Sequence, residues 1–316
     1  MYCIGFPAAH RYCMVMLPPA PAMDGLHDSF NLAPRFQIWH GRMADARFFA
    51  LFMIHFPRHA MQYALSYLGW SRLSEQEKQA LAVLLISCVC LTLLDYLTDL
   101  NWVLRCLQEW QGADGARPLR ACCSARDSTG RLVYWALTGI ACYLILPLIT
   151  IRFILRRPLA DFGVRWQGAL AAWRLYLGML ALMLPLVWLA SGSGGFLRLY
   201  PFMHFAPGAS PWPTLLWWEP MYFAQFFALE FFFRGFMLHG LAPQCGRMSV
   251  LIMTVPYTML HFGKPMPETL AAIAAGMLLG SLSLKSRSIF LGALIHCSVA
   301  LSMDTAALWR KGLLFD

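Results

Sequence analysis

Long apolar runs separated by short polar segments are the feature that most constrains the fold of this chain. A helix crosses the hydrocarbon core of a bilayer with about 20 residues, and shorter runs fit helices that are tilted or packed inside a bundle. The chain is therefore predicted to be an all-α polytopic membrane protein with about seven transmembrane helices. The seven runs are residues 80–104, 132–155, 169–190, 215–241, 248–262, 269–284 and 288–308.

The composition is that of a membrane protein rather than of a soluble domain. Of 316 residues, 59% are hydrophobic and 13% are charged, whereas soluble domains carry about 25% charged residues. The net charge of +9 does not indicate nucleic-acid binding, because the Lys and Arg residues lie in short segments between apolar runs, as in topology-setting loops. Several cysteines lie inside apolar runs, so neither a disulfide framework nor a zinc ribbon is predicted. Membrane lipids are expected partners.

The chain divides into five segments by composition. Residues 1–42 are rich in proline and are predicted to be irregular or disordered, and residues 43–79 are predicted to form interfacial amphipathic helices. Transmembrane helices are expected over residues 80–155. A second transmembrane domain, which contains the polar residues described below, is expected over residues 156–308, with a short tail over residues 309–316.

The basic residues of the loops do not settle the orientation. Segments 152–165, 242–247 and 285–287 fall on one side if seven helices alternate, and the positive-inside rule makes that side cytoplasmic. Residues 105–131, predicted to be a loop, are also basic and would fall on the opposite side. The orientation is therefore left open.

Glu230 and Arg234 are ionisable residues inside the aromatic run AQFFALEFFFRGFMLHG at residues 224–240. Their spacing places them one turn apart on one face of a helix. An ionisable pair in apolar surroundings costs several kcal/mol unless protein buries it and uses it. The pair therefore predicts either a functional site or a buried ion pair that only joins two helices.

Two histidines in later runs lie at a similar depth. Measured from the helix ends on the basic side at 1.5 Å per residue, Glu230, His261 and His296 lie roughly 16, 21 and 14 Å into the membrane. Helix tilt covers the difference, so the three side chains are predicted to face a shared cavity.

A carboxylate with two imidazoles supports two kinds of hydrolysis. Glu230 could act as a general base on a water held by His261 and His296, which would also stabilise an oxyanion. Alternatively, Glu230, His261 and His296 could hold zinc and leave a fourth position open for water. Both arrangements predict cleavage of a peptide bond in or beside the membrane, and the cofactor is left open between zinc and none.

The order of these motifs resembles the CAAX protease and bacteriocin-processing family, the Abi family of intramembrane endopeptidases. The segment DFGVRW at residues 161–166 is similar to the amphipathic lead-in of that family, and the resemblance covers roughly residues 157–308. The residues that carry it are Glu230 with Arg234 and Gly235, Tyr257 with His261, and His296.

The resemblance implies a peptide-bond hydrolase that acts on a membrane-associated protein or peptide. Glu230 would activate water, and His261 and His296 would position it and stabilise the oxyanion. Supporting roles would fall to Arg234, Tyr257 and Asp304. The bacterial inner membrane is the expected location.

Two positions depart from the pattern of the family. The first of two adjacent glutamates, generally regarded as catalytic, is replaced by Leu229, and the Asn or Asp expected four residues after His296 is Ala300. Asp304 lies about 80° around the helix from His296. The alternatives are therefore an inactive family member that serves as an immunity or scaffold protein and, less favoured because no internal repeat is found, a proton-coupled transporter.

Overall fold

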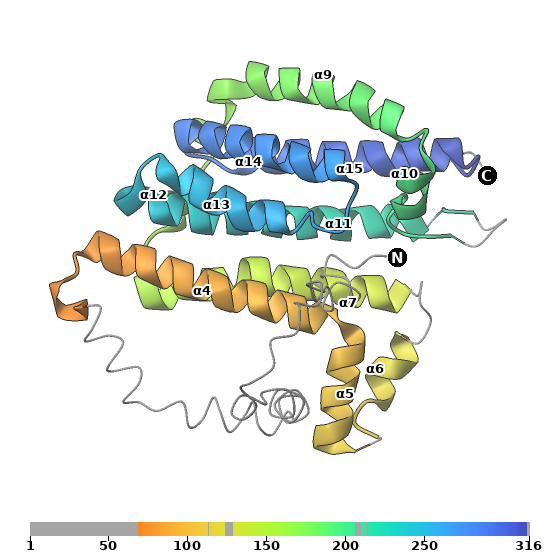
Figure 1. Cartoon of the computed structure of the whole chain (residues 1–316), viewed down its shortest axis with the longest axis horizontal. Coiled ribbons are helices and arrows are strands. Elements are labelled where there is room, and N and C mark those ends of the chain that lie inside the picture. The colour runs from red at the N-terminus through yellow and green to blue at the C-terminus, as the bar shows by residue number, and fades with distance from the viewer. Residues whose placement is uncertain (1–68, 113, 124–128, 206–209, 213, 315–316) are drawn as a thin grey trace, which may run out of the picture. The chain divides into compact units, whose positions relative to one another are not determined.

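The computed structural model describes residues 69–112, 114–123, 129–205, 210–212 and 214–314 (Figure 1). The irregular segment predicted over residues 1–42 and most of the interfacial helices predicted over residues 43–79 lie outside this range. Every regular element of the described residues is a helix, which confirms the all-α prediction. The segment boundaries stay a prediction.

Several helices are continuous runs in which π-helical turns replace α-helical ones. The α-helices are α4 (Glu75–Thr98), α5 (Leu100–Gln111), α6 (Arg117–Cys122), α7 (Thr129–Ile140), α8 (Leu146–Ile149), α9 (Trp173–Ala190), α10 (Gly194–Leu199), α11 (Thr214–Glu230), α12 (Gly240–Cys245), α13 (Met248–Met259), α14 (Met266–Ser286) and α15 (Phe290–Arg310). The π-helical segments are η3 (Ala141–Ile145), η4 (Thr150–Leu155) and η7 (Phe231–His239). The 3₁₀ segments are η2 (Trp70–Arg72), η5 (Leu159–Phe162) and η6 (Ala169–Ala172).

Among the described residues, five helical runs are long and apolar enough to cross a membrane: Glu75–Thr98, Thr129–Leu155, Trp173–Ala190, Met266–Ser286 and Phe290–Arg310. The other two predicted runs are also helical. The fourth spans α11, η7 and α12 without interruption, and the fifth is the shorter apolar helix α13. The run predicted over residues 80–104 is interrupted, because α4 ends before Asp99 (ψ 87°) and α5 begins at Leu100. The loop predicted over residues 105–131 therefore contains the end of α5, all of α6 and the first residues of α7.

The described helices fall into two units. The smaller unit contains residues 69–72 and 100–121 and consists of η2, α5 and most of α6. The larger unit contains the described parts of residues 73–99 and 122–316, and it includes all five candidate spans. Within it, α4 packs on α7 and α12, α11 packs on α7 and α15, α13 packs on α14, and α9 packs on α15 (Figure 1).

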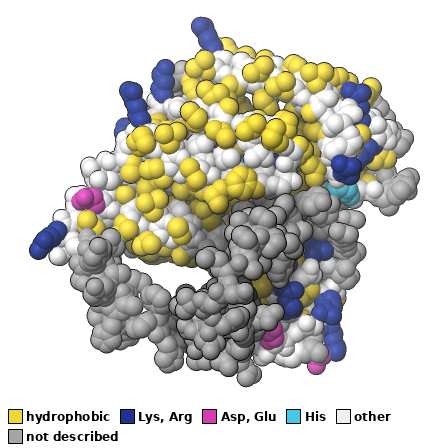
Figure 2. Space-filling model, viewed as in Figure 1, with side chains coloured by type: hydrophobic (Ala, Val, Ile, Leu, Met, Phe, Trp, Pro, Cys, Tyr) yellow, Lys and Arg dark blue, Asp and Glu magenta, His cyan; other side chains and the backbone are white. Residues whose placement is uncertain are grey.

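Apolar side chains cover much of the outside of the larger unit. Along α9, Leu182 and Leu189 are 65% and 74% exposed, and α9 is the least buried of the five candidate spans. Figure 2 shows hydrophobic side chains spread over one face, with many Lys and Arg side chains towards its edge. Because soluble proteins rarely expose apolar patches this large, this surface faces lipid and the chain is an integral membrane protein.

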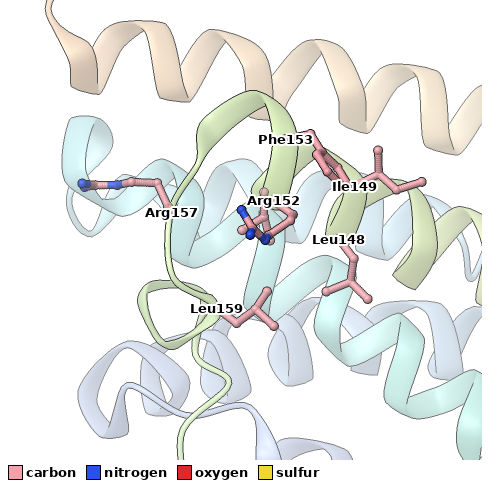
Figure 3. A pocket seen from close by; sticks show the side chains of 7 residues that line it. Leu148, Ile149, Arg152, Phe153, Arg157 and Leu159 are labelled. Carbon is pink, nitrogen blue, oxygen red and sulfur yellow. The ribbon is translucent and has the colours of Figure 1, made fainter.

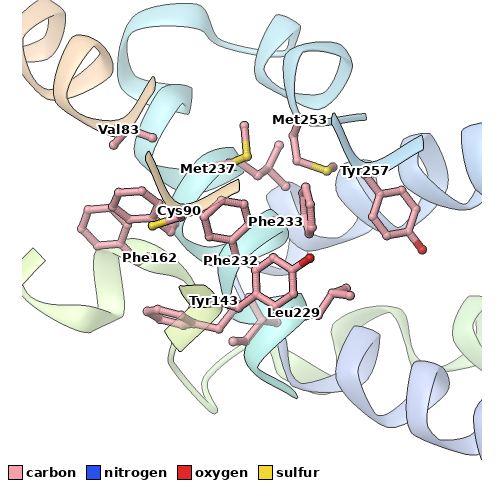
Figure 4. Close-up of a cluster of buried hydrophobic side chains, with 14 of the residues drawn as sticks. Val83, Cys90, Tyr143, Phe162, Leu229, Phe232, Phe233, Met237, Met253 and Tyr257 are labelled. Atoms are coloured by element: carbon pink, nitrogen blue, oxygen red, sulfur yellow. The ribbon is translucent and has the colours of Figure 1, made fainter. Parts of the chain in front are cut away.

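The helix η7 lies at the centre of the larger unit, and all nine of its residues are buried. A helix that carries a charged side chain among phenylalanines requires protein around it inside a membrane. Neighbouring elements supply that protein, and Figure 4 shows the cluster that results. Its labelled members are Val83, Cys90, Tyr143, Phe162, Leu229, Phe232, Phe233, Met237, Met253 and Tyr257.

The segment η5 fixes the position of η7 by close contact. Phe162 is buried and its ring lies 6.3 Å from that of Phe236. A Cβ atom at Gly235 would lie 2.9 Å from the backbone oxygen of Phe162. The glycine that follows Arg234 therefore allows the lead-in segment to pack directly on the helix that carries the polar pair.

Gly235→Ala is expected to destabilise the protein by about 1–3 kcal/mol, because the new methyl group must displace backbone atoms in a packed core. Gly178→Ala on α9 is the matched control, since a Cβ there meets no atom within 4 Å. Alanine in an open helical position stabilises by up to about 1 kcal/mol. Thermal unfolding in detergent should therefore shift in opposite directions for the two variants, and equal shifts would contradict the close contact.

Candidate functional site

Glu230 and Arg234 form a buried ion pair where α11 becomes η7. The Nη1 atom of Arg234 donates to the Oε1 atom of Glu230 at 2.9 Å, and the two side chains are 1% and 0% exposed. This confirms the predicted one-turn spacing on a shared face. The pair begins a π-helical stretch, and π-helical turns occur frequently at functional sites.

His296 on α15 bonds directly to the same carboxylate. Its Nδ1 atom lies 2.9 Å from the Oε1 atom of Glu230, and its ring lies against Phe226 with centroids 4.5 Å apart. Since a carboxylate accepts, Nδ1–H of His296 donates to it. The predicted match in depth between Glu230 and His296 therefore holds.

The second carboxylate oxygen of Glu230 is free of protein donors. Among the described residues, the buried Oε2 atom has no hydrogen-bond partner. Gly292 lies beside it, one turn before His296, and a Cβ atom there would lie 3.0 Å from Oε2. A buried carboxylate oxygen without a donor is costly, and the absence of a Cβ at Gly292 lets α15 approach this oxygen closely.

Tyr257 and His261 join this group through Arg234. The guanidinium of Arg234 lies 4.1 Å from the ring centroid of Tyr257. His261 Nδ1 donates to the backbone oxygen of Tyr257 at 3.1 Å, and the two rings lie 5.1 Å apart. His261 lies within electrostatic range of Arg234 and His296, but no hydrogen bond of the described residues joins it to Glu230.

Lys264 adds a positive charge beside His261, in the turn before α14. Its Nζ atom donates to Glu268 Oε1 at 2.6 Å, and the hydroxyl of Tyr200 donates to the same oxygen at 3.5 Å. Burial lowers the pKa of Lys264, but Tyr200 and Glu268 outweigh burial and hold the pKa above its ordinary value. Lys264 is therefore positively charged at neutral pH.

Asp304 makes its contacts away from Glu230. It is 1% exposed, and its Oδ1 atom accepts from the backbone N–H of Phe202 at 2.9 Å. The support for His296 that was predicted for Asp304 would therefore be indirect, through their shared helix α15. Ala300, at the position where the family usually has Asn or Asp, is buried in an apolar cluster.

Glu219 is a second buried carboxylate on α11. Neither of its oxygens has a donor among the described residues, and its carboxyl lies beside that of Asp304. The two buried carboxyls are therefore neighbours contributed by α11 and α15. The eleven-residue spacing from Glu230 was the available sequence signal, because it places both glutamates on one helical face.

The predicted zinc ligands do not come together as a metal site. The described residues contain no group of three His, Cys, Asp or Glu side chains placed to hold a metal ion. Glu230 Oε1 is already bonded to the Arg234 guanidinium and to His296, and a cation at that oxygen would meet the arginine charge. This geometry does not fit the three-ligand zinc arrangement.

Comparison with protein-family models identifies the region that contains this site. Residues 211–302 match the family described as Type II CAAX prenyl endopeptidase Rce1-like. The resemblance to CAAX proteases is confirmed over this region. The CAAX-protease-like region contains Glu230, Arg234, Tyr257, His261 and His296 and ends before Asp304. No curated protein and no solved structure matches the chain.

Proposed function

We propose that this protein is an intramembrane endopeptidase in which Glu230 activates water for hydrolysis of a peptide bond. The observation that carries the proposal is the buried Glu230 carboxylate, with Oε1 held by Arg234 and His296 and Oε2 free of protein donors beside Gly292. One oxygen fixes the orientation of the carboxylate, and the other is available to accept a proton. A general base needs both properties.

The reaction begins with a water between Glu230 Oε2 and the scissile carbonyl. Glu230 accepts a proton as the water oxygen bonds to the carbonyl carbon, and the negative charge moves to the carbonyl oxygen. When His296 is doubly protonated, Nδ1–H stays on Glu230 and Nε2–H donates to this oxyanion. Collapse of the intermediate breaks the C–N bond, and the proton on Glu230 passes to the leaving amine.

His261 contributes a second imidazole near the carbonyl oxygen. Its Nδ1–H is fixed on the Tyr257 carbonyl, so Nε2 is the atom that can accept a hydrogen bond from a water. The charge of Lys264 nearby favours negative charge developing at this side of the site. His261 is therefore a positioning residue for water.

The substrate class is a protein or peptide at the membrane. The name of the matching family refers to prenylated CAAX substrates, so a farnesylated CAAX peptide is the first substrate to test. We also propose that the protein acts in the bacterial inner membrane. Leu229 is buried in the core around η7, which leaves Glu230 as the carboxylate that bonds to His296.

His296→Ala is expected to lower the cleavage rate of this peptide by about 10²-fold or more, because it removes both the bond to Glu230 and the oxyanion donor. His261→Ala should lower it by about tenfold or more, because the water then loses the acceptor that positions it. Rates are measured by mass spectrometry of the products, with protein in lipid nanodiscs.

Ser298→Ala on α15 is the matched control. Its hydroxyl is exposed and bonds only to the Leu294 backbone oxygen among the described residues, so the rate should stay unchanged. A wild-type protein that binds the peptide but leaves it intact would favour an inactive scaffold. Cleavage by His296→Ala at the wild-type rate would contradict the proposed mechanism.

A further inference from the structure

A cavity of about 300 Å³ lies at the end of the transmembrane run Thr129–Leu155, outside the proposed active site. Figure 3 shows its side chains around the point where the helix ends and the chain turns back. Five of the lining residues are apolar and two are arginines. The lining residues are Leu148, Ile149, Ile151, Arg152, Phe153, Arg157 and Leu159.

A sharp reversal of the backbone builds this cavity. The π-helical segment η4 ends at Arg156, which adopts a left-handed conformation (φ 52°, ψ 42°). The backbone N–H of Arg157 then donates to the Ile151 oxygen at 3.2 Å. The chain continues through Pro158 into η5, which brings Leu159 back towards the helix (Figure 3). The cavity is therefore a product of local backbone geometry.

Nearby carboxylates neutralise little of the positive charge of the two arginines of the cavity. No carboxylate of the described residues lies within 4 Å of the Arg152 guanidinium, whose nearest aromatic contact is Phe153 at 5.9 Å. The Nε atom of Arg157 lies 3.7 Å from Asp161, and both side chains are about half exposed. Such a long, solvated pair contributes little. The cavity thus presents positive charge that an anion can neutralise.

An apolar stripe leads from the cavity towards the middle of the membrane. Ile145, Ile149 and Phe153 recur every four residues and are 46%, 46% and 67% exposed. Residues at this spacing share one helix face, and this stripe extends over about 12 Å. A free phosphate ion makes no favourable contact with such an apolar surface, whereas an acyl chain does.

We propose that this cavity binds an anionic phospholipid. Its headgroup phosphate bonds to Arg152 and Arg157, and one acyl chain lies along Ile145, Ile149 and Phe153. The location supports this occupant, because a helix end places the arginines at the interface where headgroups lie. Basic pockets at the ends of transmembrane helices bind anionic headgroups. The site is independent of the proposed protease activity.

The test measures lipid binding to the purified, delipidated full chain in detergent by native mass spectrometry. The wild type should bind phosphatidylglycerol at least about tenfold more tightly than phosphatidylcholine, since each interfacial arginine adds about a factor of five for an anionic lipid. The double variant Arg152→Gln/Arg157→Gln should lose this preference. Arg247→Gln is the matched control, because Arg247 is exposed at the start of α13 and does not line the cavity.

A second variant separates the cavity from general surface charge. Ile149→Trp fills the cavity without changing its charge and should weaken phosphatidylglycerol binding about tenfold or more. The Arg247→Gln variant should bind phosphatidylglycerol as tightly as the wild type. Three results would overturn the proposal. They are equal binding of the two lipids by the wild type, unchanged binding by both cavity variants, and competition by soluble glycerol phosphate at the concentration of the lipid.

Discussion

Glu230→Gln is expected to lower the rate of peptide cleavage by about 10²–10⁴-fold, the usual contribution of a general base. Glutamine keeps the size of the side chain and an oxygen that accepts from Arg234 and His296, but it cannot take a proton from water. The rate is measured with a farnesylated CAAX peptide in nanodiscs and is expressed per molecule of folded protein. Peptide binding should change much less than the rate.

Glu219→Gln is the matched control for this variant. Both glutamates lie on α11 and are buried, but the structure gives Glu219 no bond to His296. Its rate should stay within a few-fold of the wild type. A large loss in Glu219→Gln with normal cleavage in Glu230→Gln would move the catalytic carboxyl to the pair formed by Glu219 and Asp304.

Arg234→Met is expected to be the most destabilising substitution at the site, by about 3–5 kcal/mol. It leaves the Glu230 carboxylate fully buried without its positive partner, while the methionine roughly preserves the packed volume. Thermal unfolding in detergent measures the loss. The double variant Glu230→Gln/Arg234→Met should recover much of it, because no isolated charge then remains in the core.

Arg247→Met controls for the loss of an arginine. Arg247 is exposed, so its substitution should change stability by no more than about 0.5 kcal/mol. A loss in Arg234→Met no larger than this would show that the ion pair does not stabilise the core around η7. A double variant as unstable as Arg234→Met alone would show that packing, rather than charge, sets the cost.

The sequence predicted the parts of the site that depend on helical geometry alone. The spacing of Glu230 and Arg234 fixes their contact within one helix. The depth argument brought His296 to the same level, because residue counts convert directly into distance along a helix. The apolar runs predicted the helices of the larger unit for the same reason, and the polar side chains inside them marked which runs meet.

Contacts that depend on rotation of one helix against another could not be predicted. His261 had a suitable depth, but its neighbours on α13 direct it to Tyr257 rather than to Glu230. Glu219 and Asp304 lie beside each other because α11 and α15 pack together, and neither sequence position reveals that rotation. The π-helical turns and the left-handed Arg156 change the register locally, which a regular helical pattern does not encode.

Cleavage of the peptide in water enriched in oxygen-18 tests the central claim most directly. If Glu230 activates water, the new terminal carboxyl must contain oxygen-18, and the wild type should produce this labelled fragment while Glu230→Gln produces little of it. The products are identified by mass spectrometry. An intact peptide after long incubation with folded wild-type protein, or a labelled fragment formed equally by Glu230→Gln, would contradict the account.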